Sequence, residues 1–279
     1  MTMEMNDNSR ICSTCFHHCR LLPGQTGRCR ARQNKDGRII SMNYGRITAL
    51  ALDPIEKKPL KMFHPGTRIL SAGSYGCNLS CPFCQNYEIS QTAADSYTLS
   101  PELLAAKALE LRKNGNIGVA FTYNEPLIGW EYIYDTAKIV HSYQLYNVIV
   151  TNGTVDAGIL EKILPYTDAM NIDLKGFTPR WYHTLGGSLD IVKQTIKISA
   201  AFCHIELTTL IVPGCNDTPQ EMKELSSWVA SVDENIPLHI TRFFPRYKMN
   251  MIPPTDTGTL FKLAETARKN LKNVFIGNC

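Results

Sequence analysis

Residues 71–86, SAGSYGCNLSCPFCQN, contain Cys77, Cys81 and Cys84 in a C-x3-C-x2-C spacing. The apolar run Ile69–Leu70 comes directly before this stretch and predicts a short strand that ends where the cysteines begin. Three thiolates within eight residues suit an iron–sulfur cluster, whose irons are normally held by four cysteines. Because no fourth cysteine lies nearby, one iron would stay open to another ligand. Zinc is the alternative, but three cysteines this close together, with no histidine in the window, are unusual for a zinc hydrolase.

From Arg68 onward, apolar strand patterns alternate with helical patterns. Their Val, Ile and Leu content without strict alternation is typical of parallel strands covered on both faces. A strand–helix unit repeated about six times predicts an α/β fold with a parallel barrel, closed or partial. A doubly wound open sheet is the alternative, but no G-x-G-x-x-G follows the first strand. The expected strands are Arg68–Ala72, Ile117–Thr122, Asn147–Thr151, Ala169–Leu174, His204–Val212, Leu238–Phe244 and Asn273–Ile276. The first expected helix begins at Pro101, after the cap Ser100. Thr218 and Glu221 are expected to form a capping box at the start of a later helix. The further expected helices are Trp130–Tyr143, Ala157–Leu164, Leu189–Ala201, Pro219–Val232 and Thr257–Leu271.

Polar or glycine-rich motifs come directly after the expected strands. In a β/α barrel these strand ends share one face, and that face holds the active site. Each motif alone is weak evidence, because turn residues are expected at such positions. The six motifs together, of which the cysteine motif is one, predict a functional site. The motifs are Cys77–Cys84, Tyr123–Pro126, Thr151–Gly153, Asp173 with Lys175, Pro213–Gly214, and His239 with Arg242.

Composition narrows the class of protein. Of 279 residues, 44% are hydrophobic and 19% are charged, which excludes a disordered chain. No uncharged apolar run reaches the roughly 18 residues of a membrane span. The first ten residues, MTMEMNDNSR, lack an apolar signal region, so we expect a cytoplasmic protein with no membrane partner. Ten cysteines in that compartment indicate metal or redox chemistry rather than disulfides. The net charge of +4 is too small to indicate nucleic acid.

A second cysteine group, C-x2-C-x3-C-x9-C, precedes the barrel and completes a set of four ligands. Structural zinc and an auxiliary iron–sulfur cluster are both open at this point. The crowded spacing and the basic, glycine-containing flank Gly24–Arg32 favour a cluster. We therefore expect an N-terminal metal-binding segment with a covering loop at residues 1–66 and a barrel domain at residues 67–279. The group is Cys12, Cys15, Cys19 and Cys29, while Cys203, Cys215 and Cys279 are expected to be ordinary thiols.

The loop that we expect to cover the barrel, Asp53–Pro65, contains two adjacent lysines. Lys57 and Lys58 either face an anionic substrate or are solvated, and the sequence leaves both possibilities open.

The cysteine motif, with Phe83 before its last cysteine, resembles the radical S-adenosylmethionine (radical SAM) superfamily. More narrowly, the chain resembles the AmmeMemoRadiSam-system enzymes, relatives of the pyruvate formate-lyase activating enzymes, over nearly its whole length. This resemblance implies a partial (β/α)6 TIM-like barrel with a 4Fe–4S cluster on Cys77, Cys81 and Cys84. The motifs that carry it are Gly76–Asn86, Asp53–Leu60, Tyr123–Pro126, Thr151–Gly153, Asn171–Lys175 and Pro237–Phe243.

The resemblance also implies a reaction and its partners. The open iron would bind the amino and carboxylate groups of S-adenosylmethionine. An electron from a flavodoxin- or ferredoxin-type donor would then cleave the sulfonium to methionine and a 5′-deoxyadenosyl radical, which abstracts hydrogen from a substrate. A partner protein, as in glycyl-radical activation, is one candidate substrate, and a small molecule, a peptide or a nucleic acid is the alternative. The competing class is a non-enzymatic iron–sulfur electron-transfer module of a complex.

Single positions receive roles from the same resemblance. Glu125, beside Asn124, would hold the methionine ammonium; its alternative is an ordinary acid beside a turn proline. Asn86 would contact the nucleoside, and Phe83 would pack beside the adenine. The methionine carboxylate and ribose would be lined by Thr151, Asn152, Asp173 and Lys175, with His239 on the ribose unless it is a hydrogen-bonded core histidine. Val150 stands where the activating enzymes have an aspartate that helps bind a cation, which speaks against a cation site here.

Overall fold

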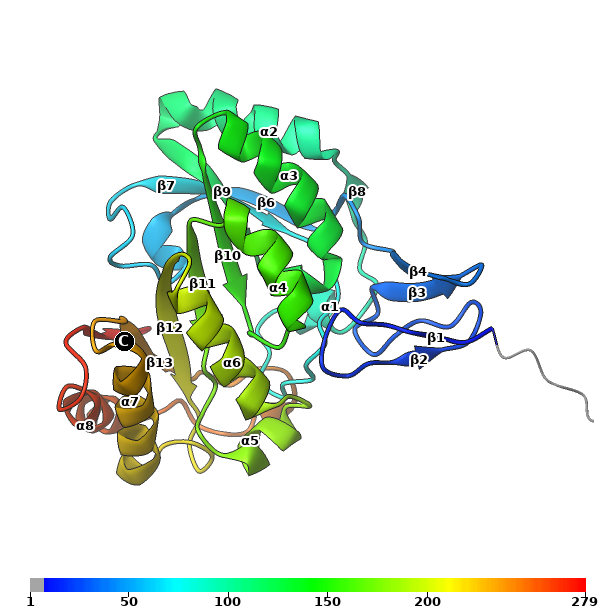
Figure 1. Cartoon of the computed structure of the whole chain (residues 1–279). Coiled ribbons are helices and arrows are strands. Elements are labelled where there is room, and N and C mark those ends of the chain that lie inside the picture. Colours follow the sequence, from blue (N-terminus) through cyan, green and yellow to red (C-terminus); the bar gives the residue numbers. More distant parts are fainter. Residues whose placement is uncertain (1–7) are drawn as a thin grey trace, which may run out of the picture.

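The computed structural model describes residues 8–279 (Figure 1). Its main sheet contains β6 (Ala49–Pro54), β7 (Arg68–Gly73), β9 (Asn116–Thr122), β10 (Tyr146–Thr151), β11 (Ala169–Asp173), β12 (His204–Ile211), β13 (Leu238–Arg242) and β14 (Val274–Gly277). These eight strands are ordered β14-β13-β12-β11-β10-β9-β7-β6. Strands β7 to β14 of this sheet run parallel, and β6 pairs antiparallel with β7. Because β14 and β6 are the two edges, the barrel is partial.

Helices connect the parallel strands. Figure 1 shows α3, α4 and α6 in front of the strands they follow. The strands and longer helices expected from the sequence are therefore confirmed, with ends that differ by a few residues. The helices are α1 (Tyr87–Ser90), α2 (Pro101–Glu110), α3 (Trp130–Ser142), α4 (Ala157–Ile163), α5 (Pro179–Thr184), α6 (Leu189–Ala200), α7 (Pro219–Asp233) and α8 (Thr257–Ala267). The sequence analysis missed the six-residue α5.

Local signals explain how two of these helices begin. The Ser100 hydroxyl caps α2 by accepting from the Leu103 amide, and the Thr218 hydroxyl caps α7 by accepting from the Glu221 amide. The expected capping box at α7 is only half present. The Glu221 carboxylate accepts from the amide of Phe177, 2.6 Å away, and so joins α7 to the segment after β11. A tertiary partner has replaced the local one.

The loop between β6 and β7 closes the end of the barrel at which the parallel strands begin. Ile55 and Leu60 in this loop are fully buried and pack with Ile69 and with one residue from each of three further strands. The Glu206 carboxylate anchors the loop by accepting from the backbone amides of Lys61 and Met62, at 2.9 and 2.7 Å. We call this loop, residues 55–67, the floor. The cysteines follow β7, at the opposite end of that strand.

The adjacent lysines of the floor, Lys57 and Lys58, have different surroundings. Lys57 is largely exposed, whereas the Lys58 side chain is buried and lies 2.9 Å from Asp53. The Asp53 carboxylate also accepts from the Tyr123 hydroxyl at 2.7 Å, and the Lys58 ammonium lies over the Tyr123 ring. Burial alone would raise the pKa of Asp53, but the hydrogen bonds and charge of Lys58 and Tyr123 outweigh it and hold this pKa below its usual range. Lys58 is therefore buried against Asp53 and is not solvated.

The N-terminal segment consists of short ribbons: β1 (Arg10–Ile11) with β2 (Arg20–Leu21), β3 (Arg32–Lys35) with β4 (Arg38–Ser41), and β5 (Arg46–Ile47) with β8 (Tyr97–Thr98). It contacts the ends of the barrel strands: Cys15 forms a bridge with Val155, and Arg32 makes an ion pair with Glu131 at 2.7 Å. The division expected after residue 66 passes through the β6–β7 pairing, and it stays a prediction. Within residues 8–279, no helix combines the length and apolarity needed to cross a membrane.

Candidate active site

The loop after β7 brings Cys77, Cys81 and Cys84 to the mouth of the barrel. All three are free thiols; Cys81 is buried, and the other two are half-buried. They pack with an apolar cluster that includes Phe83 and Trp181. The side chains of this loop are held locally. The Cys77 sulfur accepts from the Leu79 amide at 3.4 Å and from the Asn152 side-chain amide at 3.7 Å, and the Cys84 sulfur lies 3.2 Å from the Ser90 hydroxyl.

Burial controls the protonation of these thiols. It raises the pKa of Cys77 well above its ordinary value and that of Cys81 to about 11, with further contributions from neighbouring negative charges. In the absence of a ligand, both sulfurs are therefore protonated at neutral pH. Cysteine binds metals as the thiolate, so a metal group that enters here must displace these protons.

Lys175, just after β11, supplies a positive charge beside Cys81. Its ammonium lies 2.7 Å from the Asp173 carboxylate. Burial would lower its pKa, but the charge of Asp173 and the hydrogen bond to it act in the opposite direction and raise it. The backbone of Lys175 is fixed as well, because its carbonyl accepts from the Trp181 indole and from the Asn216 side chain. The lysine is thus a permanently charged group in a fixed place.

Glu125 connects the ends of β9 and β10. Its side chain is buried, and it accepts from the Thr151 hydroxyl at 2.7 Å, the Asn152 amide at 2.7 Å and the Leu127 amide at 3.1 Å. Burial raises the pKa of Glu125 to about 7, although these three donors act against it. An ionised carboxylate has about four acceptor positions, so three bonds leave one for a further donor.

Two of the three asparagines of the predicted site, Asn124 and Asn86, hold backbone groups. Asn124 accepts from the Ser74 amide and donates to the carbonyls of Tyr75 and Gly76, which fixes the turn before Cys77. The Asn86 side chain donates to the Tyr123 carbonyl at 2.7 Å. Both residues therefore connect the cysteine loop to the segment after β9.

Two predicted contacts have strong competing partners. Phe83 is buried and stacks on Trp181 with ring centres 5.9 Å apart, so a contact with adenine stays a prediction. His239 lies 2.6 Å from Glu206, the carboxylate that anchors the floor. This arrangement fits the alternative interpretation of His239 as a hydrogen-bonded core histidine. Since the floor and the cysteines lie at opposite ends of β7, we leave the ribose contact of His239 out of the proposal below.

Sequence reasoning missed Asn78 and Tyr247, which lie around the cysteine loop. Asn78 donates to the Thr154 hydroxyl at 2.8 Å and accepts from the Asn152 side chain at 2.9 Å. Tyr247 stacks on Tyr87, which follows the loop, with ring centres 4.5 Å apart. Only the position of Asn78 next to Cys77 could have indicated it, because the partners of Tyr247 are distant in the sequence.

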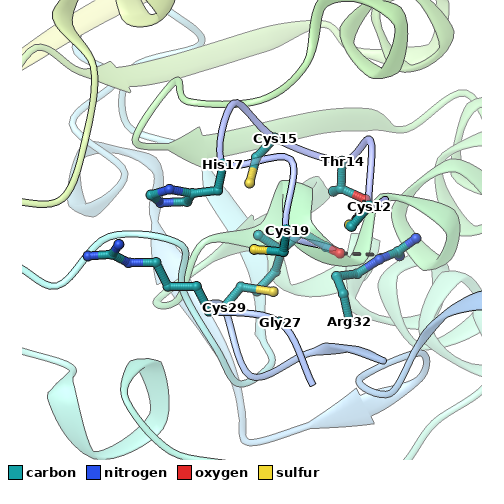
Figure 2. Close-up of a pocket in the computed structure, with 10 residues that line it drawn as sticks. Cys12, Thr14, Cys15, His17, Cys19, Gly27, Cys29 and Arg32 are labelled. Carbon is teal, nitrogen blue, oxygen red and sulfur yellow. Dashed lines mark hydrogen bonds between the residues drawn. The ribbon is translucent and has the colours of Figure 1, made fainter. Parts of the chain in front are cut away.

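The four N-terminal cysteines line one pocket together with Thr14, His17, Gly27, Arg28, Arg32 and Ile128 (Figure 2). Figure 2 shows the side chains of Cys15, Cys19 and Cys29 directed into the same space from different sides. Within residues 8–279, no group of three or more His, Cys, Asp or Glu side chains is already arranged to hold a metal ion. An iron–sulfur cluster does not need ligands that meet at one ion, because its cysteines bind different irons.

The fold and the mouth of the barrel define an α/β barrel enzyme with a cysteine-based cofactor site. The sequence model of the Radical SAM superfamily matches residues 72–229, and the chain belongs to this superfamily. Membership implies S-adenosylmethionine and a 4Fe–4S cluster as cofactors. An uncharacterized protein of Methanocaldococcus jannaschii is 36% identical over 281 residues, which cover 99% of this chain and 83% of that protein. A pyruvate formate-lyase-activating enzyme of Clostridium pasteurianum is 25% identical, with 63% of this chain and 77% of the relative covered.

Solved structures show the same fold. A domain of pyruvate-formate lyase-activating enzyme from Bacteroides vulgatus superposes with a TM-score of 0.50 and 17% identity, covering 58% of this chain and 99% of the domain. Streptococcus suis SuiB bound to S-adenosylmethionine gives a TM-score of 0.59 and 16% identity, covering 74% of this chain. The match spans about half of SuiB, 48% of its length. At these identities the likeness concerns the fold alone.

Proposed function

We propose that this enzyme reductively cleaves S-adenosylmethionine at a 4Fe–4S cluster held by Cys77, Cys81 and Cys84. The observation that carries the proposal is the placement of three free thiols at the mouth of the barrel beside a fixed cation and a buried carboxylate. A bound cluster would supply the electron that converts S-adenosylmethionine to methionine and a 5′-deoxyadenosyl radical, which then removes a hydrogen atom from a substrate.

The donor set fits this group. Three thiols supply the soft sulfur ligands that iron–sulfur clusters use, and they leave one iron for an external ligand. The mouth of the barrel also has partners for both charged ends of the methionine part. Glu125 has an acceptor position for its ammonium, and Lys175 has a positive charge for its carboxylate. Thr151 and Asn152 orient Glu125, and Asp173 orients Lys175.

Glu125 gives a prediction about affinity and pH. We expect Glu125→Gln to weaken S-adenosylmethionine binding by about 10- to 150-fold, since a hydrogen bond to a charged group contributes about 1.5–3 kcal/mol. Because the pKa of Glu125 is raised to about 7, its carboxyl is mostly protonated at pH 6 and mostly ionised at pH 8. Only the ionised form attracts an ammonium fully. The advantage of the parent over the variant should therefore grow roughly tenfold between these pH values.

Titration of the oxidised, reconstituted proteins at several pH values measures this advantage. The glutamine keeps the shape of the side chain, so circular dichroism should show the same fold. A ratio of parent to variant affinity that is close to one, or that does not change with pH, would contradict the role of Glu125.

The reaction itself separates the enzyme from the competing class, an electron-transfer module. Anaerobic, reduced protein incubated with S-adenosylmethionine should release methionine and 5′-deoxyadenosine in equal amounts, detected by chromatography and mass spectrometry. A protein that accepts and passes on electrons without forming 5′-deoxyadenosine would be a module of a complex. Glu125 and Lys175 at the mouth of the barrel favour the enzyme, because an electron relay does not need groups that bind an ammonium and a carboxylate.

For the substrate, we propose a partner protein activated by hydrogen abstraction. This proposal is supported by two relatives with 25% identity, named pyruvate formate-lyase-activating enzyme and putative glycyl-radical enzyme activating enzyme. Modification of a small molecule, a peptide or a nucleic acid is the alternative, and fold likeness does not decide between them. We further propose a flavodoxin- or ferredoxin-type donor, a cytoplasmic location, and membership of the AmmeMemoRadiSam group.

We also propose that Cys12, Cys15, Cys19 and Cys29 hold a second metal centre, either zinc or an auxiliary cluster. Four cysteines around one pocket are a complete ligand set for both.

A further inference from the structure

The N-terminal pocket contains a buried cation with an unused hydrogen-bond donor. Arg32 is 5% exposed and lines the pocket with the four cysteines. One of its terminal nitrogens lies 2.7 Å from the Glu131 carboxylate and donates weakly to the Ile128 carbonyl. The Arg32 Nε–H has no partner among the residues that the structure describes. A buried donor without a partner costs about 1–3 kcal/mol, so its persistence beside a ligand set points to an acceptor that belongs in the pocket.

The charge around the pocket is positive on two sides. Arg28 lines the pocket together with His17. Arg32 lies on another side, near Cys12 in Figure 2. A cluster with four thiolate ligands is an anion, and hydrogen bonds and charges around its sulfurs tune such a group. These two arginines therefore suit a sulfur-rich anion.

The pocket also lies directly against the cysteine loop of the barrel. The residues on both sides of Cys77 contact it: a Cβ on Gly76 would lie 2.5 Å from the Cys29 carbonyl, and the Asn78 carbonyl lies 2.8 Å from the His17 ring. Gly76 and Asn78, which flank Cys77, therefore contact the segment that would hold a metal centre in this pocket.

We propose that Cys12, Cys15, Cys19 and Cys29 hold a 4Fe–4S cluster and that Arg32 Nε donates a hydrogen bond to one of its sulfurs. This inference rests on the second metal centre proposed above and names its metal, whereas the cleavage reaction requires only the barrel thiols. Compared with zinc, a cluster adds sulfide acceptors, which match the unused donor. It also gains a further negative charge when it is reduced, and the two arginines suit that charge. Its position beside Cys77 suits a redox group, whereas zinc is redox-silent.

The test isolates this centre by removing the other one. The variant with Cys77, Cys81 and Cys84 all changed to alanine is reconstituted anaerobically with iron and sulfide, with zinc also present. We expect about four irons and four sulfides per chain, a cluster signal in Mössbauer and EPR spectra, and no stoichiometric zinc. Adding Cys12→Ala and Cys15→Ala should remove this iron. One tightly bound zinc per chain, or no metal in a folded triple variant, overturns the proposal.

Failure here leaves the proposed function intact, because that function is read from 5′-deoxyadenosine formed by the parent. Conversely, a parent that forms no 5′-deoxyadenosine does not affect the iron count of the triple variant. If alanine disturbs folding, the same count on Cys77/Cys81/Cys84→Ser keeps the test valid.

The role of Arg32 is tested by Arg32→Lys in the triple variant. Lysine keeps the positive charge toward Glu131 but lacks Nε–H. We expect the iron content to stay the same and the reduction potential of the cluster to become more negative, because a hydrogen bond to sulfur favours the reduced, more negative state. Arg38→Lys is the matched control: Arg38 is the exposed first residue of β4 in the same β3–β4 ribbon, and its replacement should leave the potential unchanged. Equal potentials in all three proteins would remove Arg32 from the proposal.

Discussion

Cys81→Ala should reduce the formation of 5′-deoxyadenosine to the background of the uncatalysed reaction while the protein stays folded. Cys81 is the buried member of the barrel triad, and its sulfur lies in an apolar cluster beside the charge of Lys175. The remaining two thiols cannot complete a three-cysteine ligand set. Alanine fits the apolar surroundings and costs about 1 kcal/mol of unfolding free energy, a small part of the total.

Cys203→Ala is the matched control. This half-buried thiol donates to the Ser199 carbonyl at the end of α6, away from the cysteine loop in the sequence, so the variant tests the effect of losing a thiol outside the barrel triad. We expect parent-like 5′-deoxyadenosine formation in this variant. Undiminished cleavage by the Cys81 variant, measured as product per chain in a single incubation, would refute the assignment of the barrel cluster.

Lys58→Met should lower the free energy of unfolding by about 3 kcal/mol, because it leaves the buried Asp53 carboxylate without its main charge partner. The ammonium of Lys58 is 3% exposed and 2.9 Å from Asp53. The Tyr123 hydroxyl and the exposed Lys57 remain near the carboxylate, so the loss falls at the lower end of the range for broken buried pairs. Urea unfolding followed by circular dichroism measures it.

Lys57→Met is the control for this prediction, since Lys57 is the neighbouring residue and contacts the same carboxylate. Its side chain is 66% exposed and 3.3 Å from Asp53, and we expect a change within about 0.5 kcal/mol. The double variant Asp53→Asn/Lys58→Met should recover part of the loss, because no buried charge is then left alone. Equal effects of the two single lysine variants would show that the buried pair is not what stabilises the floor.

The strands of the barrel could be predicted from the sequence because their signal is local. The run Val148–Val150 is apolar without alternation, as expected for a parallel strand that is covered on both faces of the sheet. The same holds for the end of each strand, where the barrel topology alone brings motifs such as Thr151–Gly153 to the cysteine loop.

Side-chain partners could not be predicted in this way, because they depend on how distant segments pack. Lys57 and Lys58 are adjacent and chemically identical, yet one is solvated and the other is buried against Asp53. His239 was assigned to the ribose from its motif, whereas its imidazole lies on Glu206. Asn78 offered no pattern at all, and its importance follows only from the contacts between the N-terminal segment and the barrel.

The ion pair of Arg32 with Glu131 has a consequence for the time course of folding during synthesis. The two residues are 99 positions apart, and the bridge between Cys15 and Val155 joins segments that are even further apart. At about 5–20 residues per second, a ribosome needs roughly 5–20 s to reach Glu131 after it has completed Arg32. Throughout that interval the four N-terminal thiols exist without the barrel segments around Ile128, Glu131 and Val155 that later contact them. We therefore expect the chain to acquire the finished pocket late, after half of the barrel has formed, although its cysteines are among the first residues to emerge.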